Sequence, residues 1–302
     1  MIFVKKQVMW AICTIIASLF SAAYYFGNQG VKVNPHAFMF YRGFVPFALL
    51  LPFIGVVPFI PAWQFYVFCI IQGCVIVFID YRNYRAMRVW GAEIISSLHP
   101  LSIGIVFLLW FTLHPQYLLT SARNMYWLVG TVAALCGVIY AASSYRNTRR
   151  SRQAFYYTMP YLFGAAACDV LNKVCMGYVS AEMLVYGSYF YIMITGAVVA
   201  AFNLLLFYRQ NKTVRPLFWA HSLKISPIML LLMGSMLFKN FAMFNTSNPS
   251  YVAAVLYLYI IWIMIFTPLL NRIGLKCPQT GLKHGKALLL LLSIVILILL
   301  NR

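Results

Sequence analysis

The sequence is dominated by a succession of apolar segments, each of the roughly 17–25 residues that an α-helix needs to cross a bilayer. Ten such segments follow one another, joined by short polar links. They lie at about residues 8–26, 37–57, 63–83, 89–111, 126–143, 155–176, 183–207, 224–244, 249–270 and 286–301. Because backbone polar groups in lipid must be satisfied internally, these segments predict helices. We therefore expect an all-α polytopic membrane protein with ten transmembrane helices.

The composition excludes an ordinary soluble domain. Hydrophobic residues make up 63% of the chain and charged residues only 9%, against about 45–50% and about 25% in soluble proteins. The net charge of +19 comes mainly from Lys and Arg residues that flank the apolar segments. This placement is typical of topological anchors, so we expect a lipid bilayer and no nucleic acid as partner. The first apolar segment has no small-residue cleavage site before a polar domain, so we interpret it as a spanning helix.

Lys and Arg are unevenly distributed over the two sides that ten spans would create. The side that holds the N-terminus carries four of these residues, and the opposite side carries sixteen. Cytoplasmic loops are enriched in Lys and Arg. The count therefore predicts that both termini lie outside the cytoplasm.

An internal similarity divides the chain into two halves. Residues 22–43 align without a gap over residues 166–187, and six of the 22 pairs are identical, where composition alone would give about one to three. Asn28 lies over Asn172 in this match. We expect two five-helix repeats, residues 1–146 and 155–302, joined by a basic linker at 147–154. Internal repeats of this kind mark transporter folds.

Charged side chains inside the expected spans are the first candidates for a site, because each costs at least about 2.5–3.5 kcal/mol at a helix centre. Asp169 and Lys173 are four residues apart with the acid first, the favourable order for an ion pair on one helix. Such a pair is either a switch beside a substrate path or a permanent structural bridge. Lys239 lies deep in the eighth expected span, and its long side chain can extend to the membrane surface.

The other candidates carry weaker signals. Arg42 lies about one turn inside the second expected helix and can equally extend to the membrane surface. Glu93, near the start of the fourth expected helix, can titrate or pair with a nearby arginine. His99 near mid-span can carry protons or simply pack with a hydrogen bond. Aromatic residues in the spans mostly indicate interface belts, and Tyr84, Trp90, Tyr186 and Tyr257 are the candidates for lining a cavity.

The sequence contains none of several common catalytic motifs. The sequence has no Walker A loop, no His-Glu-x-x-His and no Gly-x-Ser-x-Gly. The seven cysteines form no Cys-x-x-Cys and have no His at metal-ligand spacing, so they are interpreted as packing residues. We expect no enzyme activity, no cofactor and no metal.

The order and spacing of local patterns resemble the EamA-type transporters of the drug/metabolite transporter superfamily. The patterns are a polar turn with Asn34 and Pro35 followed by Arg42, a proline inside the fourth helix at Pro100, and spaced glycines in the fifth helix at Gly130 and Gly137. Residues 83–87 also lie over 239–243 at an offset of 156. The sequence departs from the family in lacking Gly-Glu at the ends of the fourth and ninth helices and a mid-helix proline in the ninth.

This resemblance implies ten helices in two inverted repeats, with the third and eighth helices lining a central cavity that would bring Lys239 and Asn240 to the substrate. It implies a cell (inner) membrane protein with both termini in the cytoplasm, opposite to the charge count. Three bases in the spans against two or three acids favour an anionic substrate.

We therefore expect a secondary transporter that moves a small polar, anionic or carboxylate-bearing metabolite by alternating access, as a monomer or homodimer. A lipid-linked head-group flippase or a non-transporting membrane assembly factor is the alternative. The expected substrate-binding residues are Arg42, Tyr84, Trp90, Glu93, Asn172, Lys173, Tyr186, Lys239 and Asn240. Those expected to form ion pairs or carry protons are Asp169, Glu93 and His99.

Overall fold

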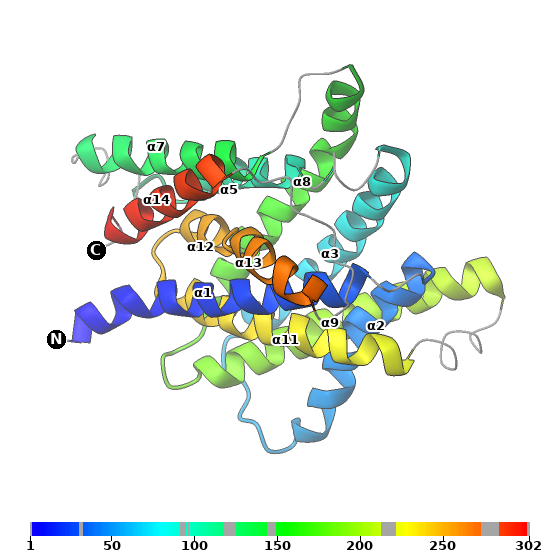
Figure 1. Ribbon diagram of the computed structural model, residues 1–302. Coiled ribbons are helices and arrows are strands. Elements are labelled where there is room, and N and C mark those ends of the chain that lie inside the picture. Colours follow the sequence, from blue (N-terminus) through cyan, green and yellow to red (C-terminus); the bar gives the residue numbers. More distant parts are fainter. Residues whose placement is uncertain are drawn as a thin grey trace.

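The structure, a computed structural model, describes residues 2–29, 33–90, 95, 97–116, 125–143, 149–212, 222–272 and 284–300. Within these ranges every regular element is helical, which confirms the expected all-α class (Figure 1). The elements are α1 (Ile2–Gln29), α2 (Pro35–Leu50), η1 (Leu51–Phe53), α3 (Trp63–Trp90), η2 (His99–Leu101), α5 (Ser102–Leu113), α7 (Met125–Ala142), α8 (Arg149–Gly177), α9 (Leu184–Asn211), α11 (Ser222–Asn245), α12 (Pro249–Leu256), α13 (Tyr259–Arg272) and α14 (His284–Leu300).

Among the described residues, seven helical stretches are long and apolar enough to cross a membrane, so the chain is a multi-pass membrane protein. They are Val8–Gly27, Pro35–Phe53, Trp63–Asn83, Met125–Ala142, Leu184–Asn211, Ile225–Asn245 and Pro249–Arg272. Two further expected spans coincide with shorter apolar helices, His99–Leu113 and Gly285–Leu300. The remaining one, α8, has 29 residues, but its tyrosines and charged residues lower its mean hydropathy.

The third helix extends further than the sequence predicts. The apolar segment ends near residue 83, yet α3 continues to Trp90. Trp90 therefore closes the third helix instead of standing near the start of the fourth, as expected. The physical reason is that the backbone hydrogen bonds of a helix continue through polar residues once the chain leaves the apolar layer, so hydropathy marks the span and not the helix end.

The helices α2 and α12 begin with the same N-terminal cap. Asn34 and Asn248 each precede a proline, and their side-chain oxygens accept 2.9 Å hydrogen bonds from His36 N and Ser250 N respectively. An asparagine cap followed by proline satisfies one backbone donor and removes another. The Asn34-Pro35 turn noted in the sequence thus begins α2, and Asn248-Pro249 begins α12 in the same way.

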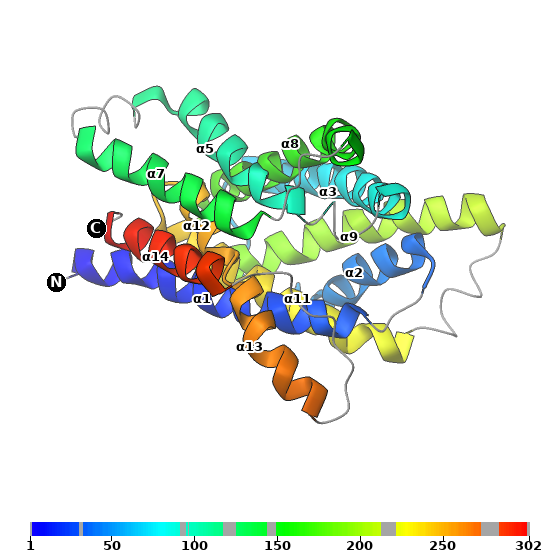
Figure 2. The same ribbon diagram turned by 45° about the horizontal axis from the view of Figure 1, so that its top comes forward.

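The helices pack in a small set of close pairs. The most extensive contacts join α1 to α11, α2 to α9, α3 to α8 and α7 to α14, and Figures 1 and 2 both show α1 beside α11. Gly43 and Gly196 bring the backbones of α2 and α9 into close contact. A Cβ atom added at Gly196 would lie 2.8 Å from Gly43 O, so only glycine permits this crossing.

Candidate functional site

A row of polar contacts joins α8 to α11 within the apolar bundle. We call it the polar seam, and it consists of Asp169, Asn172 and Lys173 on α8 and Lys239, Asn240 and Met243 on α11. Lys239 Nζ lies 2.5 Å from Asp169 Oδ1 in an ion pair. Asn172 Nδ2 donates a 2.9 Å hydrogen bond to Asn240 Oδ1. The residue numbers of the contacts rise together on both helices, so the helices run in the same direction.

Lys173 completes the polar seam. Its Nζ donates a 2.8 Å hydrogen bond to the backbone carbonyl of Met243. The expected ion pair between Asp169 and Lys173 is therefore wrong, since Asp169 pairs with Lys239 instead. An ion pair within one helix contributes only about 0.2–0.5 kcal/mol. The pairing across helices compensates Lys239, which would otherwise be an uncompensated cation inside the bundle.

The polar seam is nearly closed to solvent and only partly satisfied. The side chains of Asp169 and Lys239 are 16% and 22% exposed, whereas Asn172 and Asn240 are buried. Asn172 Oδ1 and Asn240 Nδ2 have no hydrogen-bond partner in the described part of the chain. A buried group without a partner costs about 1–3 kcal/mol. The two amides thus leave one acceptor and one donor available to a ligand.

A second ion pair lies between α2 and α3, where Arg42 Nη1 bonds to Asp80 Oδ2. The helix α3 that carries Asp80 packs along α8. Gln72 Nε2 on α3 donates a 3.0 Å hydrogen bond to the backbone carbonyl of Cys168, which directly precedes Asp169. We expected Arg42 to be a site residue but missed Asp80. The available signal was that Asp80 is one of only four acids and stands within the third apolar segment.

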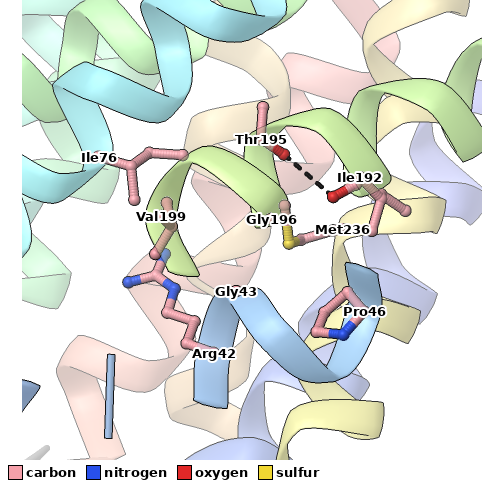
Figure 3. Close-up of a pocket in the computed structure, with 9 residues that line it drawn as sticks. All are labelled: Arg42, Gly43, Pro46, Ile76, Ile192, Thr195, Gly196, Val199 and Met236. Atoms are coloured by element: carbon pink, nitrogen blue, oxygen red, sulfur yellow. Dashed lines mark hydrogen bonds between the residues drawn. The ribbon is translucent and has the colours of Figure 1, made fainter. Parts of the chain in front are cut away.

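A small cavity lies beside Arg42, where α2 crosses α9 (Figure 3). The space open to the centre of a water molecule is about 20 Å³, room for a single water. Figure 3 shows Arg42 on α2 extending toward Val199 on α9, with Pro46 further along α2. The lining residues are Arg42, Gly43, Pro46, Ile76, Ile192, Thr195, Gly196, Val199 and Met236.

The other predicted site residues lie elsewhere. Trp90 packs in a separate cluster with Ala86 and Leu98. The Nε2 atom of His99 lies 3.3 Å from Asn83 Oδ1. Tyr186 is half-buried and packs against the hydrophobic cluster around Trp10, Tyr191 and Tyr251, which we call the main core.

Glu93 and the side chain of Tyr84 lie outside the described residues. The structure thus brings Asp169, Asn172, Lys173, Lys239 and Asn240 together in the polar seam. In the described ranges, no group of three His, Cys, Asp or Glu side chains is placed to hold a metal ion.

Chemically, the polar seam offers an ammonium group, an amide donor and an amide acceptor, set between two parallel helices. It can bind and release a polar solute if α8 and α11 move apart. No protein-family model matches the chain, and a search of curated proteins finds no match.

Proposed function

We propose that the protein is a secondary transporter for a small polar metabolite that carries a negative charge. In this proposal it is an EamA-type member of the drug/metabolite transporter superfamily, without a catalytic step or a cofactor. The main support is the charge held among the helices: two ion pairs and Lys173, whose partner is a carbonyl. Ionisable groups among spanning helices are costly and mark substrate and ion pathways.

The helix contacts support two five-helix repeats within a ten-helix fold. In the two expected repeats, the helices that correspond are α1 and α8, α2 and α9, α3 and α11, α5 and α12, and α7 and α14. When each helix is exchanged for its counterpart, the α1–α11 contact becomes α8–α3, and the α3–α9 contact becomes α11–α2. The same exchange turns α5–α8 into α12–α1, while α2–α9, α5–α12 and α7–α14 each map onto themselves. Contacts that exchange in this way are expected of two copies of one unit related by a pseudo-two-fold axis.

Alternating access then requires the helices to separate. The cavity beside Arg42 holds about 20 Å³, too little for a metabolite. In the proposed cycle the two repeats rock about the Gly43–Gly196 crossing and open the polar seam alternately to each side of the membrane.

The test is uptake of radiolabelled organic anions into sealed vesicles that contain the purified protein. We expect at least one anion to enter, and replacement of Lys173 by glutamine to slow its entry about tenfold or more. Lys286→Gln is the matched control, because Lys286 also donates to a backbone carbonyl, Ser143 O at 2.7 Å, but lies on α14. Its uptake should equal that of the unmodified protein.

Two other outcomes of this experiment would contradict the transporter proposal. If none of the tested anions enters the vesicles, and a fluorescent lipid becomes accessible to an external reductant, then the protein is a lipid flippase. If neither solute nor lipid crosses, the transporter proposal is wrong.

A further inference from the structure

We propose that the polar seam recognises a small hydroxycarboxylate. Lys173 and Asn240 bind its carboxylate, and Asn172 accepts a hydrogen bond from its neighbouring hydroxyl. This inference rests on the proposed transport function and names the substrate class of the same site.

The charge of the polar seam points to Lys173 as the group that binds the anion. The positive charge of Lys239 is matched by the Asp169 carboxylate at 2.5 Å. Lys173 has a carbonyl as its partner, and in the described ranges neither ion pair includes it. An ammonium group has three donors, so two remain after the bond to Met243 O. The polar seam therefore carries one positive charge without a counter-ion, on the residue that follows Asn172 along α8.

The two amides define the rest of the ligand. Asn172 and Asn240 make one hydrogen bond to each other, which leaves Asn240 Nδ2 as a donor and Asn172 Oδ1 as an acceptor, both buried. A carboxylate can accept from the donor but gives nothing to the acceptor. A ligand that satisfies both amides must carry a carboxylate and a hydrogen-bond donor together. Turning both amides over exchanges the roles of the two residues and still leaves one donor and one acceptor.

The net charge of the occupied polar seam distinguishes a hydroxyl from an ammonium group as the ligand's hydrogen-bond donor. A hydroxycarboxylate carries one negative charge, which compensates Lys173 and leaves the polar seam neutral. An amino acid brings an ammonium group as well, so the single positive charge stays uncompensated in the bundle. A dicarboxylate would leave a negative charge instead. Because uncompensated charge is costly between spanning helices, the neutral hydroxyl is the favoured donor.

The experiment measures the stabilisation of the detergent-purified full chain against heat by four related probes. L-lactate has both groups, propionate lacks the hydroxyl, lactamide lacks the charge, and alanine replaces the hydroxyl by ammonium. A ligand that binds only the folded state raises the unfolding temperature according to its dissociation constant. We expect lactate to bind about tenfold or more tightly than each of the other three probes, because each leaves a buried group or charge unmatched.

Variants assign the contacts. Lys173→Gln should weaken lactate binding about tenfold or more, Lys173→Arg should retain most of it, and Lys286→Gln should leave it unchanged. Asn172→Ala should reduce the preference for lactate over propionate to less than about threefold while both anions still bind. This loss of preference would not follow from a merely structural role. If Lys173→Gln does not fold, Asn240→Ala provides the second test of the carboxylate contact, with the same expected loss.

The inference is overturned if lactate does not stabilise the protein, if Lys173→Gln and Asn240→Ala bind it normally, or if Asn172→Ala keeps the preference. Binding in detergent does not depend on transport. Lactate binding without uptake of any anion would therefore contradict the transporter proposal alone. Anion uptake without lactate binding would contradict the hydroxycarboxylate site alone.

Discussion

Each ion pair inside the bundle joins two different helices, so the two partners cannot be judged separately. Asp169 on α8 and Lys239 on α11 are both largely shielded from solvent, and the removal of either leaves a charge without its counter-ion. The attraction between buried partners is offset by their desolvation, so the loss of one partner costs more than the loss of both. The same reasoning applies to Arg42 and Asp80.

This asymmetry predicts the outcome of a double-mutant cycle on Asp169 and Lys239. Asp169→Asn and Lys239→Met should each lower the free energy of unfolding by about 1–3 kcal/mol. The double variant should recover to within about 1 kcal/mol of the unmodified protein, because no uncompensated charge remains. Denaturant unfolding in detergent measures all three. Additive losses in the double variant would show that the two side chains do not interact.

Which residues form the polar seam could be predicted from the sequence better than which side chains they contact. Charge within an apolar segment identified Asp169, Lys173 and Lys239 from the sequence alone. The pairing of Asp169 with Lys173 was wrong, because helical periodicity reports neighbours on the same helix and says nothing of the helix packed opposite. Lys173 and Asp169 both find their partners on α11, about 70 residues away in sequence. The packing of α8 on α11 determines these partners.

Among the elements, the contact between α2 and α9 is the most sensitive to side-chain size. At Gly43 an added Cβ atom would lie 2.6 Å from Ala200 N and even closer to Gly196 O. Both obstacles belong to the backbone of α9, so a rotamer change cannot relieve them. The two helices can accommodate a larger residue only by moving apart.

We therefore predict that Gly43→Ala destabilises the protein by about 1–3 kcal/mol, the usual cost of overpacking. Gly177→Ala is the matched control, because Gly177 ends α8 and a Cβ atom there would meet nothing within 4 Å. It should change the stability by less than about 1 kcal/mol. Thermal unfolding in detergent compares the two. An equal effect of both substitutions would mean that the α2–α9 crossing is not close-packed.

At the scale of the whole molecule, the lengths of the apolar segments predicted where helices lie, but not where a helix is interrupted. Each of the ten expected segments overlaps a helix or a pair of helices, but the expected segment 249–270 is two helices, α12 and α13, separated at Tyr257 and Leu258. Neither proline nor glycine marks this break. It is a matter of tertiary packing, since Leu258 is buried in the main core, and a hydropathy pattern cannot show it.

The orientation of the molecule in the membrane is the remaining prediction at this scale. Sixteen Lys and Arg residues flank the ten expected spans on one side and four on the other, and the richer side should face the cytoplasm. Alkaline phosphatase fused after Arg302 in a bacterial host should then be active, and a green fluorescent protein fused there should be dark. Fusions after residue 148, on the opposite side, should give the reverse result and serve as the internal control. A fluorescent fusion after Arg302 would place the C-terminus in the cytoplasm, as in EamA-type transporters, and would mean that the repeat packing, and not the count of basic residues, determines how this chain is inserted.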